Sequence, residues 1–86
     1  MGFVVYILRS KKDGSLYVGH TNDLARRLAE HNNPLGKSYT AKRGPWELVH
    51  SEDHPDRSTA MNREHYLKSH AGAHEKKQLA SGGSVG

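Results

Sequence analysis

The sequence contains no cysteine, which excludes a disulfide framework and any metal site built on thiolates. It has no apolar run close to the ~18 residues that a transmembrane helix needs, and the apolar stretch Phe3–Leu8 is too short for a signal peptide. Only 34% of the 86 residues are hydrophobic, so we expect a single domain with a thin core. These absences favour a soluble, cytoplasmic protein without a membrane partner.

Acidic side chains are also few, since nine Asp and Glu residues stand against thirteen Lys and Arg residues. The formal net charge is +4, and the isoelectric point is about 9.6. This balance favours a polyanionic partner such as nucleic acid, although many small proteins without such a partner are equally basic.

Two apolar segments near the N-terminus predict a β-hairpin. Val4–Leu8 is a continuous, largely β-branched run that suits a strand buried on both faces. Asp-Gly at positions 13–14 predicts the turn, and Leu16–Gly19 forms the return strand. If the loop has an even number of residues, Tyr6 and Tyr17 lie on one face of the hairpin, whereas a one-residue bulge would separate them.

A helix is predicted directly after the hairpin, with Asn22 or Asp23 as its N-cap. One face of this helix carries, at the spacing i, i+3, i+4 and i+7, Leu24, Arg27, Leu28 and His31. A buried guanidinium is costly without a partner, so Arg27 and His31 among leucines need an explanation. They either serve a site, or they lie at the edge of the apolar face and at a frayed helix end.

Glu64 is the second unexpected residue in an apolar pattern. The second predicted helix, capped by Asp56 or Ser58, has an apolar face made of Ala60, Leu67 and Ala71, with Glu64 among them. A carboxyl group that faces a core becomes neutral, pairs with a cation or binds a metal. From the residues alone, an Arg27–Glu64 ion pair without any chemistry is a sufficient explanation.

The rest of the chain completes an α+β fold in which helices flank a three-stranded antiparallel sheet. Trp46–His50 is the predicted third strand, and alternation places Trp46, Leu48 and His50 on one face of it. Gly72 is expected to end the second helix, with one further helical turn within 73–79. We expect one domain over residues 1–79 and a flexible Gly/Ser-rich tail over 80–86.

Three histidines outside the first helix are expected to lie at the surface. His20, just past the second strand, is expected to be exposed and inert, and His50 and His54 are expected at the surface.

A basic segment between the first helix and the third strand carries Lys37, Tyr39, Lys42 and Arg43. Cations around an aromatic ring suit contact with nucleic acid, and a solvated loop is the alternative.

Taken in order, these segments resemble the GIY-YIG endonuclease family, and in particular its small, stand-alone, single-domain bacterial members. The matching motifs are Val4-Val5-Tyr6, Tyr17-Val18-Gly19, Asn22-Asp23-Leu24 with Arg27 and His31, and the segments 41–49 and 56–64. The resemblance covers roughly residues 3–70. The chain departs from the family in having Val4-Val5 in place of Gly-Ile and no second histidine near Tyr39.

The resemblance implies a metal-dependent endonuclease that hydrolyses phosphodiester bonds. The implied catalytic residues are Tyr6, Tyr17, Arg27, His31 and Glu64, with Glu64 as ligand of one Mg²⁺ or Mn²⁺ ion. Tyr6 would be the general base, Tyr17 would orient it, and His31 would assist. A free phenol titrates near ~10, so this role requires Arg27 or the metal to lower the pKa of Tyr6. Gly19 would let backbone and substrate approach closely.

DNA is the expected substrate rather than RNA, in repair, recombination or processing. The chain has no room for a separate DNA-binding domain, so we expect selection by DNA structure or by a partner protein.

Two other classes of function stay open. A non-catalytic nucleic-acid-binding module would bind in a salt-sensitive way without metal dependence. A small scaffold would be indifferent to both metal and nucleic acid.

Overall fold

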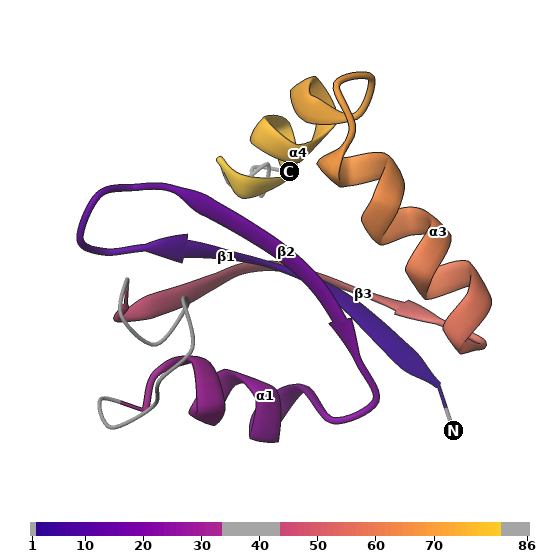
Figure 1. Ribbon diagram of the computed structural model, residues 1–86, viewed down its shortest axis with the longest axis horizontal. Coiled ribbons are helices and arrows are strands. Elements are labelled where there is room, and N and C mark those ends of the chain that lie inside the picture. The colour runs from indigo at the N-terminus through magenta and orange to yellow at the C-terminus, as the bar shows by residue number, and fades with distance from the viewer. Residues whose placement is uncertain (1, 34–43, 82–86) are drawn as a thin grey trace.

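The computed structural model describes residues 2–33 and 44–81, and these form an α+β fold. Its elements in chain order are β1 (Phe3–Ser10), β2 (Leu16–Thr21), α1 (Leu24–His31), β3 (Trp46–His54), α3 (Arg57–Lys68) and α4 (Ala73–Ala80). The sheet is antiparallel with strand order β2-β1-β3. Helix α1 covers one face, and α3 and α4 cover the other (Figure 1). The expected fold class is confirmed.

The β1–β2 hairpin has the predicted register. Tyr6 lies opposite Gly19 and Leu8 lies opposite Tyr17, with no irregularity between them. Tyr6 and Tyr17 therefore lie on the same face of the sheet, as expected. The turn uses Gly14 at φ 77°, a conformation that glycine adopts without steric cost.

The pairing of β1 with β3 contains a β-bulge. Ile7 lies opposite His50 but Leu8 lies opposite Leu48, so Val49 is an extra residue on β3. Because neighbouring residues of β1 point to opposite faces, His50 lies on the face opposite to Leu48. The expectation that both lie on one face is therefore wrong. β3 also continues to His54, beyond its expected end.

Two apolar clusters lie on the two faces of the sheet, and β1 contributes to both. The cluster under α1 contains Tyr6, Leu8 and Trp46, with Tyr17, Leu24 and Leu28 packed against it. The cluster under α3 and α4 contains Val5, Ile7, Val18, Ala60, Leu67 and Ala80. Residues 5–8 are each at most 1% exposed, which explains why the first strand reads as an unbroken apolar run.

The two helix starts agree with the predicted caps. The Asp23 carboxylate accepts a hydrogen bond from the backbone N–H of Arg26 at 3.1 Å, and the Asp56 carboxylate accepts one from Thr59 at 2.9 Å. Within the described residues, no helix has the length and apolar character needed to cross a membrane.

The end of α3 differs from the prediction. The helix stops at Lys68, Ala71 is exposed, and Gly72 comes at the start of α4 rather than at the end of α3. A Cβ at Gly72 would collide with the carbonyl oxygen of Tyr66, so the tight turn between the two helices requires glycine. Helix α4 includes Ala80, whose side chain is buried, so Ala80 belongs to the folded domain and not to a tail.

Candidate active site

Three of the predicted site residues meet on the α1 face of the sheet. The Tyr6 hydroxyl lies 3.0 Å from Nε2 of His31, and both side chains are buried. The ring of Tyr17 lies 5.0 Å from that of His31 and 6.4 Å from that of Tyr6, measured between centroids. The alternative of a frayed His31 is therefore wrong, because this histidine is held in the core by a buried phenol.

Gly19 makes room for the Tyr6 hydroxyl. A Cβ at position 19 would lie 2.5 Å from the Tyr6 oxygen and 2.8 Å from its Cζ. The Tyr6 ring therefore crosses over Gly19 towards the outer strand β2, which has no side chain at that point. The group that lies closest to the vacant Cβ position of Gly19 is thus the Tyr6 side chain, while the approach of a substrate at Gly19 stays a prediction.

Glu64 lies on the opposite face of the same outer strand. Its side chain is only 13% exposed, and its two oxygens bind Nδ1 of His20 and, at 2.5 Å, Nζ of Lys68. The Lys68 ammonium also lies 5.7 Å from the centre of the Tyr17 ring. Lys68 thus extends past the edge of β2 and connects the carboxylate on one face with the tyrosines on the other.

Arg27 does not pair with Glu64, so the proposed ion pair between them is wrong. Its guanidinium binds Glu30 at 3.1 Å, and its side chain is about half exposed. Arg27 also acts on Tyr6, since its charge lowers the pKa of the phenol against larger opposing effects. Arg27 therefore lies close enough to Tyr6 to affect its charge and is at the same time partly exposed to solvent.

His20 is a member of this site that the sequence analysis missed. It was expected to be exposed and inert, yet its side chain is 21% exposed and contacts Glu64. Strand alternation could have indicated this position of His20. It comes two residues after the buried Val18 on β2 and therefore lies on the same face. That face is the one that α3 covers.

Near pH 7 the Tyr6 phenol is protonated and the His31 imidazole is neutral. Burial, followed by the nearby Tyr17, raises the pKa of Tyr6 to about 12. The general-base role requires Arg27 or a metal to lower this pKa; Arg27 does lower it, but burial and Tyr17 outweigh that effect. Burial, followed by the charge of Arg27, lowers the pKa of His31, so this imidazole is neutral near pH 7.

Glu64 is held in its ionised form. Burial by itself would raise its pKa, but the hydrogen bonds from Lys68 and His20 outweigh burial and lower the pKa. No group of three or more His, Asp or Glu side chains suited to a metal occurs within residues 2–33 and 44–81. A hard cation that keeps most of its waters needs few protein ligands. One ionised carboxylate fits such an ion once the Lys68 ammonium moves aside.

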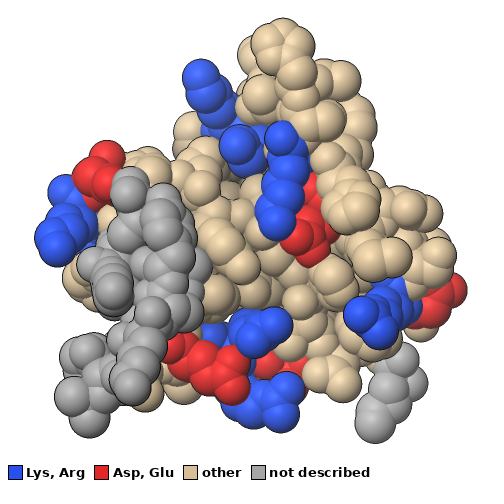
Figure 2. Space-filling model, in the orientation of Figure 1, with Lys and Arg blue, Asp and Glu red and all other residues tan. Residues whose placement is uncertain are grey.

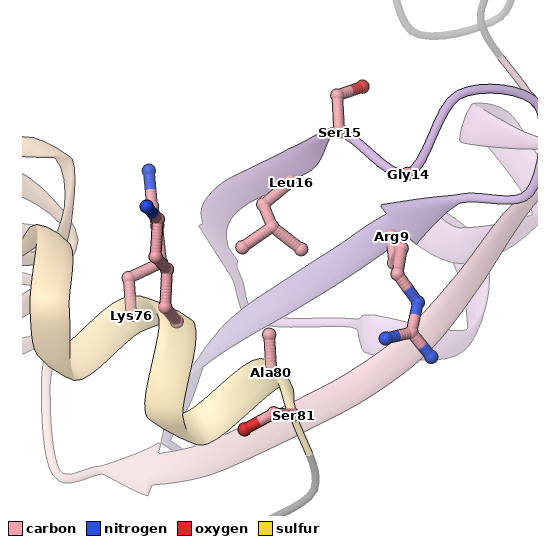
Figure 3. A pocket seen from close by; sticks show the side chains of 8 residues that line it. Arg9, Gly14, Ser15, Leu16, Lys76, Ala80 and Ser81 are labelled. Carbon is pink, nitrogen blue, oxygen red and sulfur yellow. The ribbon is translucent and has the colours of Figure 1, made fainter.

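The four residues predicted to contact nucleic acid, Lys37, Tyr39, Lys42 and Arg43, fall outside the described residues. A cavity of about 440 Å³ opens between the hairpin turn and α4, where Leu16 and Ala80 face it and Arg9 and Lys76 lie beside it (Figure 3). It contains none of the predicted catalytic residues, so it is not the candidate active site.

One edge of the sheet thus gathers two tyrosines, two histidines, an arginine and a carboxylate. In a comparison with known families, residues 2–78 match the model described as the GIY-YIG catalytic domain. The chain belongs to the GIY-YIG family of nuclease domains, and a nuclease domain implies a nucleic-acid substrate.

Similar chains are themselves small. A UPF0213 protein of Haloquadratum walsbyi is 46% identical over 80 residues, which cover 93% of this chain and 88% of that protein. A UPF0213 protein of Clostridium perfringens is 44% identical, with coverage of 94% and 85%. The solution NMR structure of a UPF0213 protein from Bacillus halodurans is 41% identical, covers 94% of this chain and 84% of that one, and has a TM-score of 0.55. The expected similarity to small single-domain members is confirmed.

Proposed function

We propose that this chain is a divalent-metal-dependent endonuclease that hydrolyses phosphodiester bonds in DNA. The observation that carries the proposal is the buried hydrogen bond between Tyr6 and His31, which runs over Gly19 at the sheet edge that also holds Glu64. Hydrolysis of a phosphodiester needs a deprotonated water, stabilisation of charge on the phosphate and help for the leaving oxygen. The residues of this edge can meet the first two needs.

The proton of the attacking water has a path into the protein. A phenol with a pKa of about 12 is almost entirely protonated near pH 7, so Tyr6 is not a base on its own. Neutral His31 can accept the Tyr6 proton at Nε2 while Tyr6 takes a proton from the water. Tyr17 packs against the His31 ring and helps to hold it in place.

Charge on the phosphate would be met by Arg27 and by the ion at Glu64. A planar guanidinium binds two phosphate oxygens at once, and Arg27 is exposed enough to exchange Glu30 for a phosphate. A single Mg²⁺ or Mn²⁺ ion held by Glu64 would act as a Lewis acid on the phosphate oxygens. Lys68 would leave Glu64 for solvent when that ion binds.

Substrate choice completes the proposal. The chain would act on DNA rather than RNA, in the cytoplasm, in repair, recombination or processing, and would select structure rather than sequence. Lys37, Tyr39, Lys42 and Arg43 would contact the nucleic acid, and a partner protein would add specificity. Their charges and one aromatic ring support this assignment.

The test is a cleavage assay with Mg²⁺ and with Mn²⁺ on single-stranded, duplex, flap and branched DNA and on RNA. We expect metal-dependent cutting that falls by at least about 10²-fold in Glu64→Ala and in Tyr6→Phe, with both variants folded by circular dichroism. Glu47→Ala is the matched control, because Glu47 pairs with Arg9 at the surface. Tight, salt-sensitive binding without any cutting would replace this proposal with the binding module.

Metal binding has a readout that does not depend on activity. An ion that binds only the folded protein raises its melting temperature. Mn²⁺ should therefore stabilise the wild type and Glu47→Ala but not Glu64→Ala. Equal stabilisation of all three would show that Glu64 is not the ligand.

A further inference from the structure

A polar groove lies next to the candidate active site. Its volume is about 330 Å³, and it is bounded by the end of β2, by α1 and by the start of α3. The lining residues that matter here are Phe3, His20, Arg26, Arg27, Glu30 and Arg57. Figure 2 shows Lys and Arg side chains over α1 and near the N-terminal end of α3, the two helices that contribute to the groove. None of the roles assigned above uses Arg26 or Arg57.

The groove has an excess of positive charge. Three arginines face one acidic residue, Glu30, which binds Arg27 at 3.1 Å and reaches Arg26 only at 4.0 Å. Arg57 has no acidic partner within the described part of the chain, and its side chain is exposed. Arginine clusters of this kind suit phosphate, because each guanidinium offers a fork of donors to two oxygens.

Two residues join this groove to the catalytic groups. His20 lines the groove and binds Glu64 through Nδ1. Arg27 lines it as well and acts on the pKa of Tyr6. Arg57 precedes Glu64 by seven residues on α3, which is about 10 Å along the helix axis. A nucleic-acid strand whose scissile phosphate lies at Arg27 would therefore continue into the groove.

We infer that this groove is a second phosphate subsite, in which Arg57 and Arg26 bind the phosphate next to the one that is cut. The inference rests on the proposed function, because it takes the substrate to be a nucleic-acid strand. Arg57 is a positioning residue here and does not touch the reacting atoms. Its contact exists equally in the ground state and the transition state, so its loss should raise KM and leave kcat nearly unchanged.

Binding can be measured without cleavage in a Glu64→Gln background. Fluorescence anisotropy with a single-stranded oligonucleotide should give a Kd that rises roughly three- to tenfold on adding Arg57→Ala, with the salt slope reduced by about one. Arg57→Lys should recover part of the loss. Lys77→Ala on α4, which removes an equal charge outside the groove, is the matched control and should leave Kd and slope nearly unchanged.

The substrate offers a second, independent test. Once wild-type cleavage has located the cut, an oligonucleotide with one neutral methylphosphonate beside the scissile position should bind more weakly to the Glu64→Gln protein. The same replacement should cost little further affinity when Arg57→Ala is present, because both changes remove one contact. A methylphosphonate several positions away should weaken both proteins equally.

The outcomes separate this inference from the proposed function. A wild type that never cuts overturns the nuclease, while the anisotropy comparison of Arg57→Ala with Lys77→Ala still reads the subsite. Equal Kd and salt slope for those two variants overturn the subsite even if the wild type cuts well. A fall in kcat with unchanged KM for folded Arg57→Ala would also overturn it, since that result would place Arg57 in the chemistry.

Discussion

At the scale of single residues, the proposed mechanism depends on two coupled proton transfers. Tyr6 keeps its proton because it is buried, and His31 lacks one because it is buried beside Arg27. The 3.0 Å contact between them lets the phenol lose its proton at the same time as the imidazole gains one. In the proposed mechanism, the pair can take up a proton only while His31 is neutral.

This requirement predicts the pH dependence of cleavage. The pKa of His31 lies below its usual value of about 6.5, so His31 becomes protonated only as the pH falls below that value. We expect kcat/KM to be constant near neutral pH and to fall about tenfold per pH unit in more acidic solution. His31→Gln should be about 10²-fold less active and lose this acid limb. An unchanged limb in that variant would show that another group controls it.

Gly19 and Gly14 predict opposite consequences for the same substitution. Gly19→Ala places a Cβ 2.5 Å from the Tyr6 hydroxyl oxygen and 2.8 Å from its Cζ, so we expect a loss of about 1–3 kcal/mol and of most cleavage activity. Gly14→Ala meets no atom within 4 Å but strains a φ of 77°, so it should cost about 1 kcal/mol and leave activity intact. Chemical unfolding and the cleavage assay, run on both variants, check the contrast. Equal activity of the two would remove Gly19 from the site.

Single residues also show what the sequence could and could not predict. The shared face of Tyr6 and Tyr17 followed from strand alternation together with an even-numbered loop. The contact of His20 with Glu64 was not predicted. Alternation along β2 places His20 on the same face as Val18, but a histidine after a strand usually faces solvent. Lys68 could not be found at all, since its reach around β2 to the Tyr17 ring depends on how α3 lies against the sheet.

At the scale of elements, β3 and α3 are joined by ion pairs as well as apolar contacts. Glu52 on β3 accepts hydrogen bonds from Arg63 on α3 at 2.7 Å and from His50 and His54 at 2.8 and 2.9 Å. Arg63 also binds Glu75 on α4 at 2.5 Å. Burial alone would raise the pKa of Glu52, but these hydrogen bonds outweigh burial and lower it to about 2.

Glu52 therefore predicts an acid-dependent part of the stability. Its pKa is lower in the folded protein than the ordinary 4.5, so its contribution is complete above about pH 4.5 and is lost as the pH falls towards 2. Glu52→Gln should lower the free energy of unfolding near pH 7 by about 1–3 kcal/mol and flatten its dependence between those pH values. Glu47→Gln, at an exposed ion pair, should change it by less than about 0.5 kcal/mol. Urea unfolding across this pH range decides between the variants.

Element boundaries were predicted where local residues determine them. Asp23 and Asp56 cap their own helices, so their positions could be found from neighbouring residues. The bulge at Val49 and the early end of α3 could not be predicted from the sequence. Both depend on contacts between distant segments, namely the pairing of β3 with β1 and the turn that brings Gly72 against Tyr66.

At the scale of the whole molecule, the sheet separates two small cores, and each needs its own covering helices. The fold class could be predicted because three strands and two amphipathic helices leave few arrangements for so short a chain. The role of α4 could not be predicted, because its sequence is polar. Only its contacts with α3, β1 and β3 show that it covers the second core.

Helix α4 is therefore expected to be essential for the fold although it lies away from the catalytic groups. A chain that ends at Gly72 would expose the cluster around Ile7, Val18 and Leu67 and lose the Arg63–Glu75 ion pair. Because burial of apolar surface is the main favourable contribution to folding, this exposure should lower the melting temperature by more than about 10 °C. A chain that ends at Ser81 retains α4 and is the matched control. If the shorter chain melted like the control and still cut DNA, the second core would be complete without α4, and the domain would end where α3 ends.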